Sequence, residues 1–276
     1  MKYKLAGYFI ILIALAVFVY PTISSMYQEY RAAQAIDVHT DNLIEKSENE
    51  YEEEREKCIA YNRQLAIGSS PISEKSENKD TEYESLLNTG GIMGFIEIPS
   101  ISQKLPIYHY SNSEELERGI GHVHGSSLPV GGESTNCVLT GHRGLPGNML
   151  FTRLDEVNVG DMIYLTVLGE RLSYSITDTK VVLPEDTEWI KIERGKDLVT
   201  LITCTPYAVN THRLVITAER VTESQETEEY RPLSKISVVL NAVPLTKLYI
   251  AAGIIVLIVA AEVIGAVRRR RHAKKI

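Results

Sequence analysis

The part of the sequence best suited to chemistry is TLITCTPYAVNTHRL, from Thr200 to Leu214. Cys204 ends an apolar, alternating run, and Pro206, which cannot continue a central strand, places this cysteine at a strand end. If the residues after TPYAVNT pair with that strand, Arg213 returns to the neighbourhood of Cys204. A guanidinium there favours thiolate over thiol and can donate hydrogen bonds to an oxyanion during acyl transfer.

A nucleophilic cysteine also needs an imidazole that accepts and returns a proton. His212 precedes Arg213 directly, so on a strand it faces the opposite side, and we interpret it as a surface histidine. His142, in VLTGHRGLPG, follows a predicted strand, where catalytic side chains are commonly presented. These residues favour acyl transfer by Cys204 and His142 with help from Arg213. The alternative is a Cys204 that packs as a small apolar residue.

His122 and His124 form an H-x-H pair in GHVHG, a pattern that can bind a metal ion. No third or fourth ligand accompanies the pair at a suitable spacing, so we expect neither a metal site nor a cofactor.

Two apolar segments flank the chain. Residues 5–20 follow Lys2 and Lys4 and precede only a weak signal-peptide cleavage candidate, PTISS, which predicts an uncleaved membrane anchor over residues 1–24. Residues 248–267 are long enough to cross a bilayer, although Glu262 interrupts them and a buried core helix is the alternative. The basic tail at 268–276, RRRRHAKKI, favours the membrane span. Basic residues mark the cytoplasmic side, so both termini are predicted inside and the catalytic domain outside the cell.

Charge and cysteine content limit the possible partners. Eight of the 29 basic residues lie in the two tails and one of the 36 acidic residues lies in the second apolar segment, which leaves 21 basic and 35 acidic residues, a net charge of −14, in between. Nucleic-acid binding is therefore not expected, because it requires clustered basic residues. The odd number of cysteines, three, leaves at least one thiol free or paired with another molecule.

The sequence between the apolar segments changes character along its length. Residues 25–66 are polar and predict a helical stalk, with Cys58 half-buried; residues 67–90 are loop-like; residues 223–247 read as a linker. Residues 91–222 contain short strand candidates and one candidate helical turn, in LPGNMLFTRLD, and predict a small closed or nearly closed β structure. The strand candidates are residues 93–98, 105–107, 136–140, 162–167, 172–177, 180–182, 198–204 and 213–219.

The catalytic candidates resemble those of a known family. TLITC is similar to the T-L-x-T-C signature of sortases, the cysteine transpeptidases of Gram-positive cell surfaces, and TGH and Arg213 match the family's histidine and arginine in the same chain order. The resemblance runs from about residue 83 to 221, through MGFIEIP, LPIYH and GIGHVHGSSLPVGG, and is closer to the pilus-assembling class C sortases.

The resemblance implies a mainly β fold: an eight-stranded sortase β-barrel with short helices, an N-terminal helical segment and two flanking transmembrane helices. It also implies a mechanism. Cys204 attacks the Thr–Gly amide of an LPxTG-like sorting signal, His142 protonates the leaving amine, Arg213 stabilises the oxyanion and Thr203 shapes the substrate pocket. A lysine amine of a pilin subunit then resolves the thioester. No metal or other cofactor is implied.

One feature departs from the class C pattern. These enzymes commonly carry an Asp-Pro-aromatic lid over the active site, and here only Ser70, Pro71 and Ile72 lie at a similar distance, without the carboxylate or the ring. A weakened lid and a simple loop remain equal alternatives. The rival functions are a sortase that uses a peptidoglycan amine, a hydrolytic cysteine peptidase, and a non-catalytic membrane-anchored binding domain.

Overall fold

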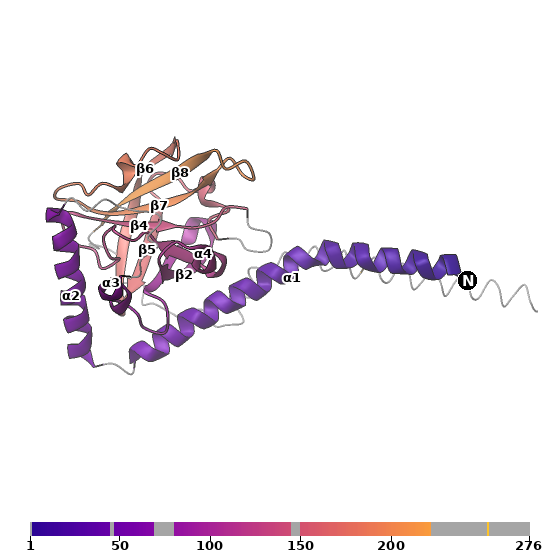
Figure 1. The fold of residues 1–276 in the computed structure, drawn as a ribbon, viewed down its shortest axis with the longest axis horizontal. Helices are drawn as coiled ribbons and strands as arrows, with labels where there is room; N and C mark the ends of the chain where they lie inside the picture. The colour runs from indigo at the N-terminus through magenta and orange to yellow at the C-terminus, as the bar shows by residue number, and fades with distance from the viewer. Residues whose placement is uncertain (1, 45–46, 69–79, 145–149, 222–252, 254–276) are drawn as a thin grey trace, which may run out of the picture.

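A computed structural model describes residues 2–44, 47–68, 80–144, 150–221 and 253 of the chain (Figure 1). The lid candidates Ser70, Pro71 and Ile72 lie outside the described residues. So do the predicted linker at 223–247, the basic tail at 268–276 and, except for Gly253, the second apolar segment at 248–267.

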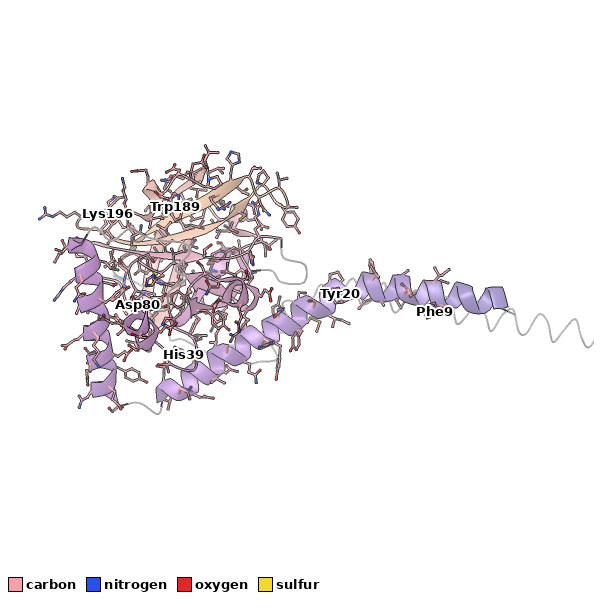
Figure 2. The ribbon with its side chains drawn as sticks, viewed as in Figure 1. Phe9, Tyr20, His39, Asp80, Trp189 and Lys196 are labelled. Atoms are coloured by element: carbon pink, nitrogen blue, oxygen red, sulfur yellow. The ribbon has the colours of Figure 1, made fainter. Side chains whose placement is uncertain are left out.

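Helix α1 (Lys2–Ile44) runs without a break through Pro21 and past residue 24, where the predicted anchor meets the predicted stalk. Its first half projects away from the rest of the molecule (Figure 1), and Phe9 and Tyr20 are exposed there (Figure 2). In its second half, Ile36 packs against Phe95 and Tyr108 of the β structure. Helix α1 is therefore apolar and unpacked at one end and docked at the other.

Helix α2 (Glu48–Ile67) stands beside the barrel (Figure 1) and begins where the backbone N–H of Ser47 donates to the Glu50 carboxylate, at 2.7 Å. Cys58 on this helix is fully buried in the main core rather than half-buried as predicted, because α2 packs directly on the barrel. Asn62 donates to the Leu128 carbonyl at 3.2 Å and accepts from the Leu128 N–H at 2.7 Å. These two bonds fix α2 against the loop before β4.

Eight strands form a closed barrel, in the order β1-β2-β3-β4-β7-β8-β6-β5 with β5 returning to β1. The strands are β1 (Gly94–Ile98), β2 (Gln103–His109), β3 (Ile120–His122), β4 (Thr135–Thr140), β5 (Met162–Val167), β6 (Glu170–Val182), β7 (Asp197–Thr205) and β8 (His212–Arg220). Short helices lie between them: α3 (Thr81–Ser85) before β1, η1 (Pro99–Ile101), α4 (Ser113–Arg118), η2 (Leu154–Glu156) and η3 (Glu188–Ile190). The predicted eight-stranded barrel is confirmed.

Two strands differ from the prediction. The candidates at 172–177 and 180–182 are one strand, β6, whose register shifts between Ile176 and Asp178 while both halves pair with β8. The eighth strand is β3, which the sequence did not indicate because three residues flanked by glycine are too short to display alternation. The helical turn predicted in LPGNMLFTRLD is found as η2, at the end of that stretch.

The wall formed by β4, β7 and β8 is buried on both faces. Leu139, Leu201 and Ile216 pack in the barrel interior, whereas alternating neighbours pack in a second, outer cluster that η3 covers with Trp189 and Ile190. The neighbours in the outer cluster are Val138, Ile202 and Val215. Burial on both faces explains why the sequence of β7 is a nearly continuous apolar run. It also gives rigid support to the residues at the ends of these strands.

Candidate active site

Three strand ends bring the predicted catalytic residues together. Strands β4 and β7 are parallel, with Thr140 beside Ile202, so the segment that carries His142 leaves β4 at the level where β7 reaches Cys204. Strand β8 is antiparallel to β7, and Arg213 lies directly opposite Cys204. Opposed residues of an antiparallel pair project to the same face with Cβ atoms about 5 Å apart, so Cys204 and Arg213 share one face. The expectation from the sequence that Arg213 returns to the neighbourhood of Cys204 is therefore confirmed.

These side chains are open to ligands. Cys204, His142 and Arg213 are each partly exposed, and Cys204 is a free thiol. The Arg213 Nη1 atom donates to the His212 carbonyl oxygen at 3.3 Å, and no carboxylate of the described residues forms an ion pair with this guanidinium. Arg213 is consequently available to donate to an oxygen placed near Cys204.

Thr203, the predicted substrate-binding residue, is buried and does not face a surface open to substrate. Its side chain is buried, and its hydroxyl donates to the Gly141 carbonyl oxygen at 2.7 Å. The Gly141 N–H in turn donates to the Ile202 carbonyl at 3.2 Å. Thr203 therefore supports the residue before His142, and it does not reach the surface where a substrate would lie.

The residue after His142 makes contacts that the sequence did not indicate. The Arg143 side chain is only 8% exposed, its Nη1 donates to the Thr205 hydroxyl at 2.8 Å and its Nη2 lies 2.5 Å from the Asp155 carboxylate of η2. Gly144 has a φ of 82°, and a Cβ there would lie 2.9 Å from the Tyr207 ring. Adjacency to His142 was the only sequence signal for Arg143.

The two histidines of the H-x-H pair are explained by packing. The ring of His122 is fully buried, with one nitrogen 2.7 Å from the Tyr83 hydroxyl and the other 2.9 Å from the Ser127 carbonyl oxygen. Burial lowers the pKa of His122 to about 3. His124 pairs with Asp80 at 3.2 Å. With both nitrogens of His122 engaged, the H-x-H pair is a structural element around Tyr83, and the described residues contain no group of metal ligands.

The two other cysteines are remote from the site. Cys137 lies opposite Val199, five residues before Cys204 and hence about 16 Å away along the strand. Burial raises the pKa of the Cys137 thiol, and it raises the pKa of the Cys58 thiol to about 12. Both thiols are buried and remain protonated, whereas Cys204 is the one partly exposed cysteine of the chain. Cys204 is therefore the candidate nucleophile.

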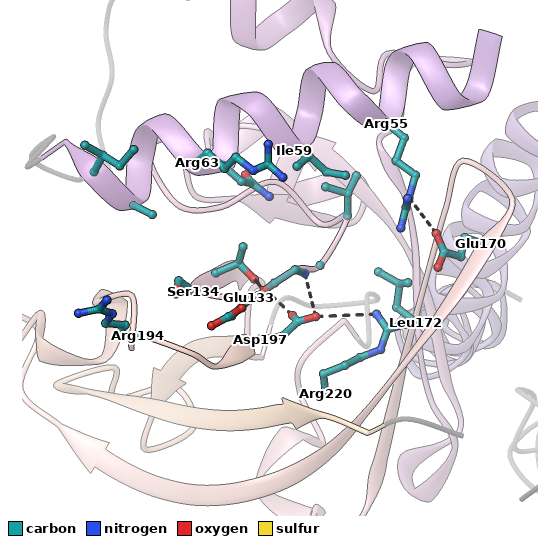
Figure 3. Close-up of a pocket in the computed structure, with 17 residues that line it drawn as sticks. Arg55, Ile59, Arg63, Glu133, Ser134, Glu170, Leu172, Arg194, Asp197 and Arg220 are labelled. Atoms are coloured by element: carbon teal, nitrogen blue, oxygen red, sulfur yellow. Dashed lines mark hydrogen bonds and ion pairs between the residues drawn. The ribbon is translucent and has the colours of Figure 1, made fainter. Parts of the chain in front are cut away.

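A pocket of about 790 Å³ lies at the opposite end of the barrel, between α2 and the starts of β4 and β7 (Figure 3). Its floor is the Asp197 carboxylate, which accepts from the Gly132 N–H at 2.9 Å and from the Tyr174 hydroxyl at 3.0 Å. Because Thr135 and Asp197 begin the strands whose far ends carry His142 and Cys204, this pocket is separate from the candidate active site.

Comparison with known proteins identifies the family. The family model of the sortase domain matches residues 96–221. Sortase D of Bacillus subtilis (strain 168) is 32% identical over 169 residues, which cover 60% of this chain and 81% of that protein. The chain belongs to the sortase family. It is therefore a cysteine transpeptidase of the sortase type.

Solved sortase structures agree with the fold and narrow the class. Sortase C1 of GBS pilus island 1 superposes with a TM-score of 0.67 at 38% identity, covering 72% of this sortase and 96% of that chain. Sortase C of Streptococcus pneumoniae gives a TM-score of 0.65 at 37% identity, covering 68% and 97%. These matches extend beyond the barrel and show that this sortase is similar to class C enzymes.

One helix in the described part of this sortase is long and apolar enough to cross a membrane. It lies within Phe9–Ile44 of α1, with a mean hydropathy of 2.2 over its most apolar window. This N-terminal helix is compatible with a membrane anchor.

Proposed function

We propose that this sortase cleaves an LPxTG-like sorting signal between Thr and Gly and transfers the acyl group to a lysine amine of a pilin subunit. The observation that carries the proposal is the pairing of Cys204 with Arg213 on one face, beside the strand end that leads to His142. Cysteine, histidine and arginine on three adjacent strand ends supply a nucleophile, a proton carrier and an oxyanion donor.

The reaction has two steps. In the first, the Cys204 thiolate adds to the threonine carbonyl carbon, the Arg213 guanidinium donates to the resulting oxyanion, and the C–N bond breaks as the His142 imidazolium protonates the departing glycine amine. In the second, the lysine amine attacks the thioester, His142 accepts a proton from it, and the C–S bond breaks to return the thiolate. An isopeptide bond is formed, and neither a metal ion nor an oxidant takes part.

Thr203 has a supporting role in this proposal. Its bond to Gly141 holds the backbone before His142, and the buried side chain leaves substrate contacts to other residues.

The acceptor amine is inferred from the relatives. One similar solved structure is the sortase C1 of a GBS pilus island, and another, sortase C of Streptococcus pneumoniae, is described in terms of pilin substrate specificity. Several curated relatives are instead sortases A, for example that of Streptococcus agalactiae, at 32% identity over 70% of its length. Transfer to a peptidoglycan amine is therefore the second candidate, and the higher identity and coverage of the class C structures favour pilin.

Location follows from the anchor. We propose that α1 holds the barrel outside the cell membrane, that residues 248–267 form a second span, and that both termini are cytoplasmic. The basic residues beside both apolar segments support this orientation.

The test uses the full chain in membrane vesicles, mixed with an LPxTG-like peptide and either a pilin-derived lysine peptide or a peptidoglycan amine. Mass spectrometry should detect a thioester on Cys204 and then an isopeptide product with the lysine peptide. Cys204→Ala should abolish both, whereas Cys137→Ala, which removes a buried thiol, should retain them. Thioester formation by Cys204→Ala would overturn the mechanism, and a product with the peptidoglycan amine alone would overturn the acceptor.

A further inference from the structure

We propose that Arg143 is a positioning residue that sets the catalytic geometry by joining the His142 segment to the strand end carrying Cys204. The inference rests on the proposed function for its catalytic consequence, while its structural part stands on contacts of the described residues alone.

The side chain of Arg143 connects three segments that are distant in sequence. It leaves the chain directly after His142, donates to Thr205, the residue after Cys204, at 2.8 Å, and pairs with Asp155 of η2 at 2.5 Å. At 8% exposure the side chain has lost most of its water, and the two partners replace hydration at Nη1 and Nη2, whereas the buried Nε has no hydrogen-bond partner among the described residues. A charge-assisted bond in that setting is stronger than one at the surface.

The backbone on both sides of His142 is also held. Gly141 exchanges hydrogen bonds with Ile202 and Thr203 on β7, at 3.2 and 2.7 Å. Gly144 donates to the Thr152 hydroxyl at 3.3 Å and leaves no room for a Cβ beside Tyr207. Every immediate neighbour of His142 is therefore anchored, and Arg143 is the neighbour whose side chain reaches the cysteine strand beyond Cys204.

The His142 residue is held through its backbone and not through its side chain. Its carbonyl accepts from the Phe151 N–H at 3.2 Å, and no hydrogen bond of its ring is formed with the described residues. A general acid must lie within hydrogen-bond reach of the leaving group, and a displacement of about 1 Å can lower the rate by about 100-fold. The direction of the ring thus depends on the backbone that Arg143 helps to fix.

Arginine is suited to this position because its planar fork offers separate N–H groups to two acceptors. Lysine carries a compact charge that can keep the Asp155 contact but cannot hold the same spacing to Thr205. We therefore expect Arg143→Lys to retain part of the positioning of the His142 segment and Arg143→Met to lose it.

The matched control is Arg153→Met. Arg153 lies just before η2 and also pairs with a carboxylate, Glu156 at 2.6 Å, but its side chain is 38% exposed and does not contact β7. Thr205→Val is a milder second variant, because it removes a single acceptor from Arg143 and keeps the shape of the side chain. It keeps the proposal testable if Arg143→Met does not fold.

The structural part is measured on full chain in detergent micelles by NMR of ¹³C-labelled histidine rings, with the His142 signal assigned by its loss in His142→Gln. We expect the His142 ring signal to move or broaden in Arg143→Met and in Thr205→Val, and to stay in place in Arg153→Met. An unchanged His142 signal in both Arg143→Met and Thr205→Val would overturn the proposal. This readout does not depend on any enzymatic activity, so it decides the inference even if the proposed reaction fails.

The catalytic part is measured by steady-state transpeptidation. We expect Arg143→Met to lower kcat by about 10- to 100-fold with KM changed less than about threefold, and Arg143→Lys to recover part of the loss. A residue that acts through His142 should add nothing once His142 is removed, so His142→Ala and the double variant should be equally slow. An unchanged kcat in Arg143→Met, or a further loss in the double variant, would refute the positioning role.

Discussion

At the scale of single residues, burial separates the histidines and cysteines into buried structural residues and partly exposed candidates for catalysis. His122 is enclosed by Tyr83, Ser126, Ser127, His109 and His124, and its two ring nitrogens are engaged. Its contacts fit a neutral ring that donates to the Ser127 carbonyl and accepts from the Tyr83 hydroxyl. Cys204, His142 and Arg213 instead remain partly exposed at strand ends. The sequence identified these three, because each follows or begins a strand, but Arg143 carried no pattern of its own.

The buried His122 predicts a pH dependence of stability. Its folded-state pKa is about 3, below the ordinary 6.5, because burial disfavours the charged ring. The unfolded chain therefore binds a proton below about pH 6.5 while the folded chain does not, and stability is lost as the pH falls from there toward 3, by at most about 1.4 kcal/mol per pH unit. His109, whose pKa burial also lowers, adds in the same direction.

Urea unfolding of the full chain at pH 7, 6 and 5 measures this slope. His122→Gln should be less stable at pH 7 yet lose stability less steeply, whereas His212→Gln, which alters a ring bonded only to Thr211 near the surface, should keep the wild-type slope. Equal slopes for wild type and His122→Gln would contradict the assignment.

At the scale of elements, the catalytic geometry comes from register rather than from local sequence. The hairpin of β7 and β8 was predictable, since a short connection and alternating residues place Arg213 opposite Cys204. The parallel pairing of β4 with β7 was not predictable, because β5 and β6 lie between these strands in the chain and neither strand sequence indicates which strand it pairs with. Strand β3 and the bulge of β6 were missed because both lack regular alternation.

Helix α2 supplies an element-scale prediction. Asn62 satisfies the buried N–H and carbonyl of Leu128 at once, so Asn62→Ala leaves a donor and an acceptor unpaired and should lower the free energy of unfolding by about 2 kcal/mol. Arg63→Ala, on the exposed face next to it, is the matched control and should change stability by less than about 0.5 kcal/mol. Urea denaturation at neutral pH compares the two, and equal midpoints would mean that α2 does not depend on this contact.

At the scale of the whole molecule, a rigid barrel is combined with a helix that leaves it. Helix α1 packs on β1 and β2 through its second half and extends away through its first half, so one continuous helix joins the barrel to the apolar segment (Figure 1). An anchor joined in this way restricts how far and in which directions the catalytic residues can move above a membrane surface.

The proposed membrane attachment through both ends predicts redundancy. Deleting residues 2–24 or residues 248–276 alone should leave the chain in the membrane fraction, and deleting both should release it, because each apolar segment is proposed to hold the chain in the membrane by itself. Fractionation and carbonate extraction followed by immunoblotting measure the outcome. Release by either single deletion would show that only one segment is an anchor.

The closure of the barrel has a consequence for recognition. An open sheet edge can capture an extended peptide by adding it as a further strand, so that backbone groups alone provide affinity for almost any sequence. In the described barrel the doubly paired stretch of each strand has a neighbour on both sides, and that mode is removed there, although beyond Ile176 strand β6 pairs with β8 alone. Along the doubly paired stretches, the sorting signal proposed as substrate must be read through its side chains, a mode that selects for a short motif over the many other extended segments exposed at a cell surface.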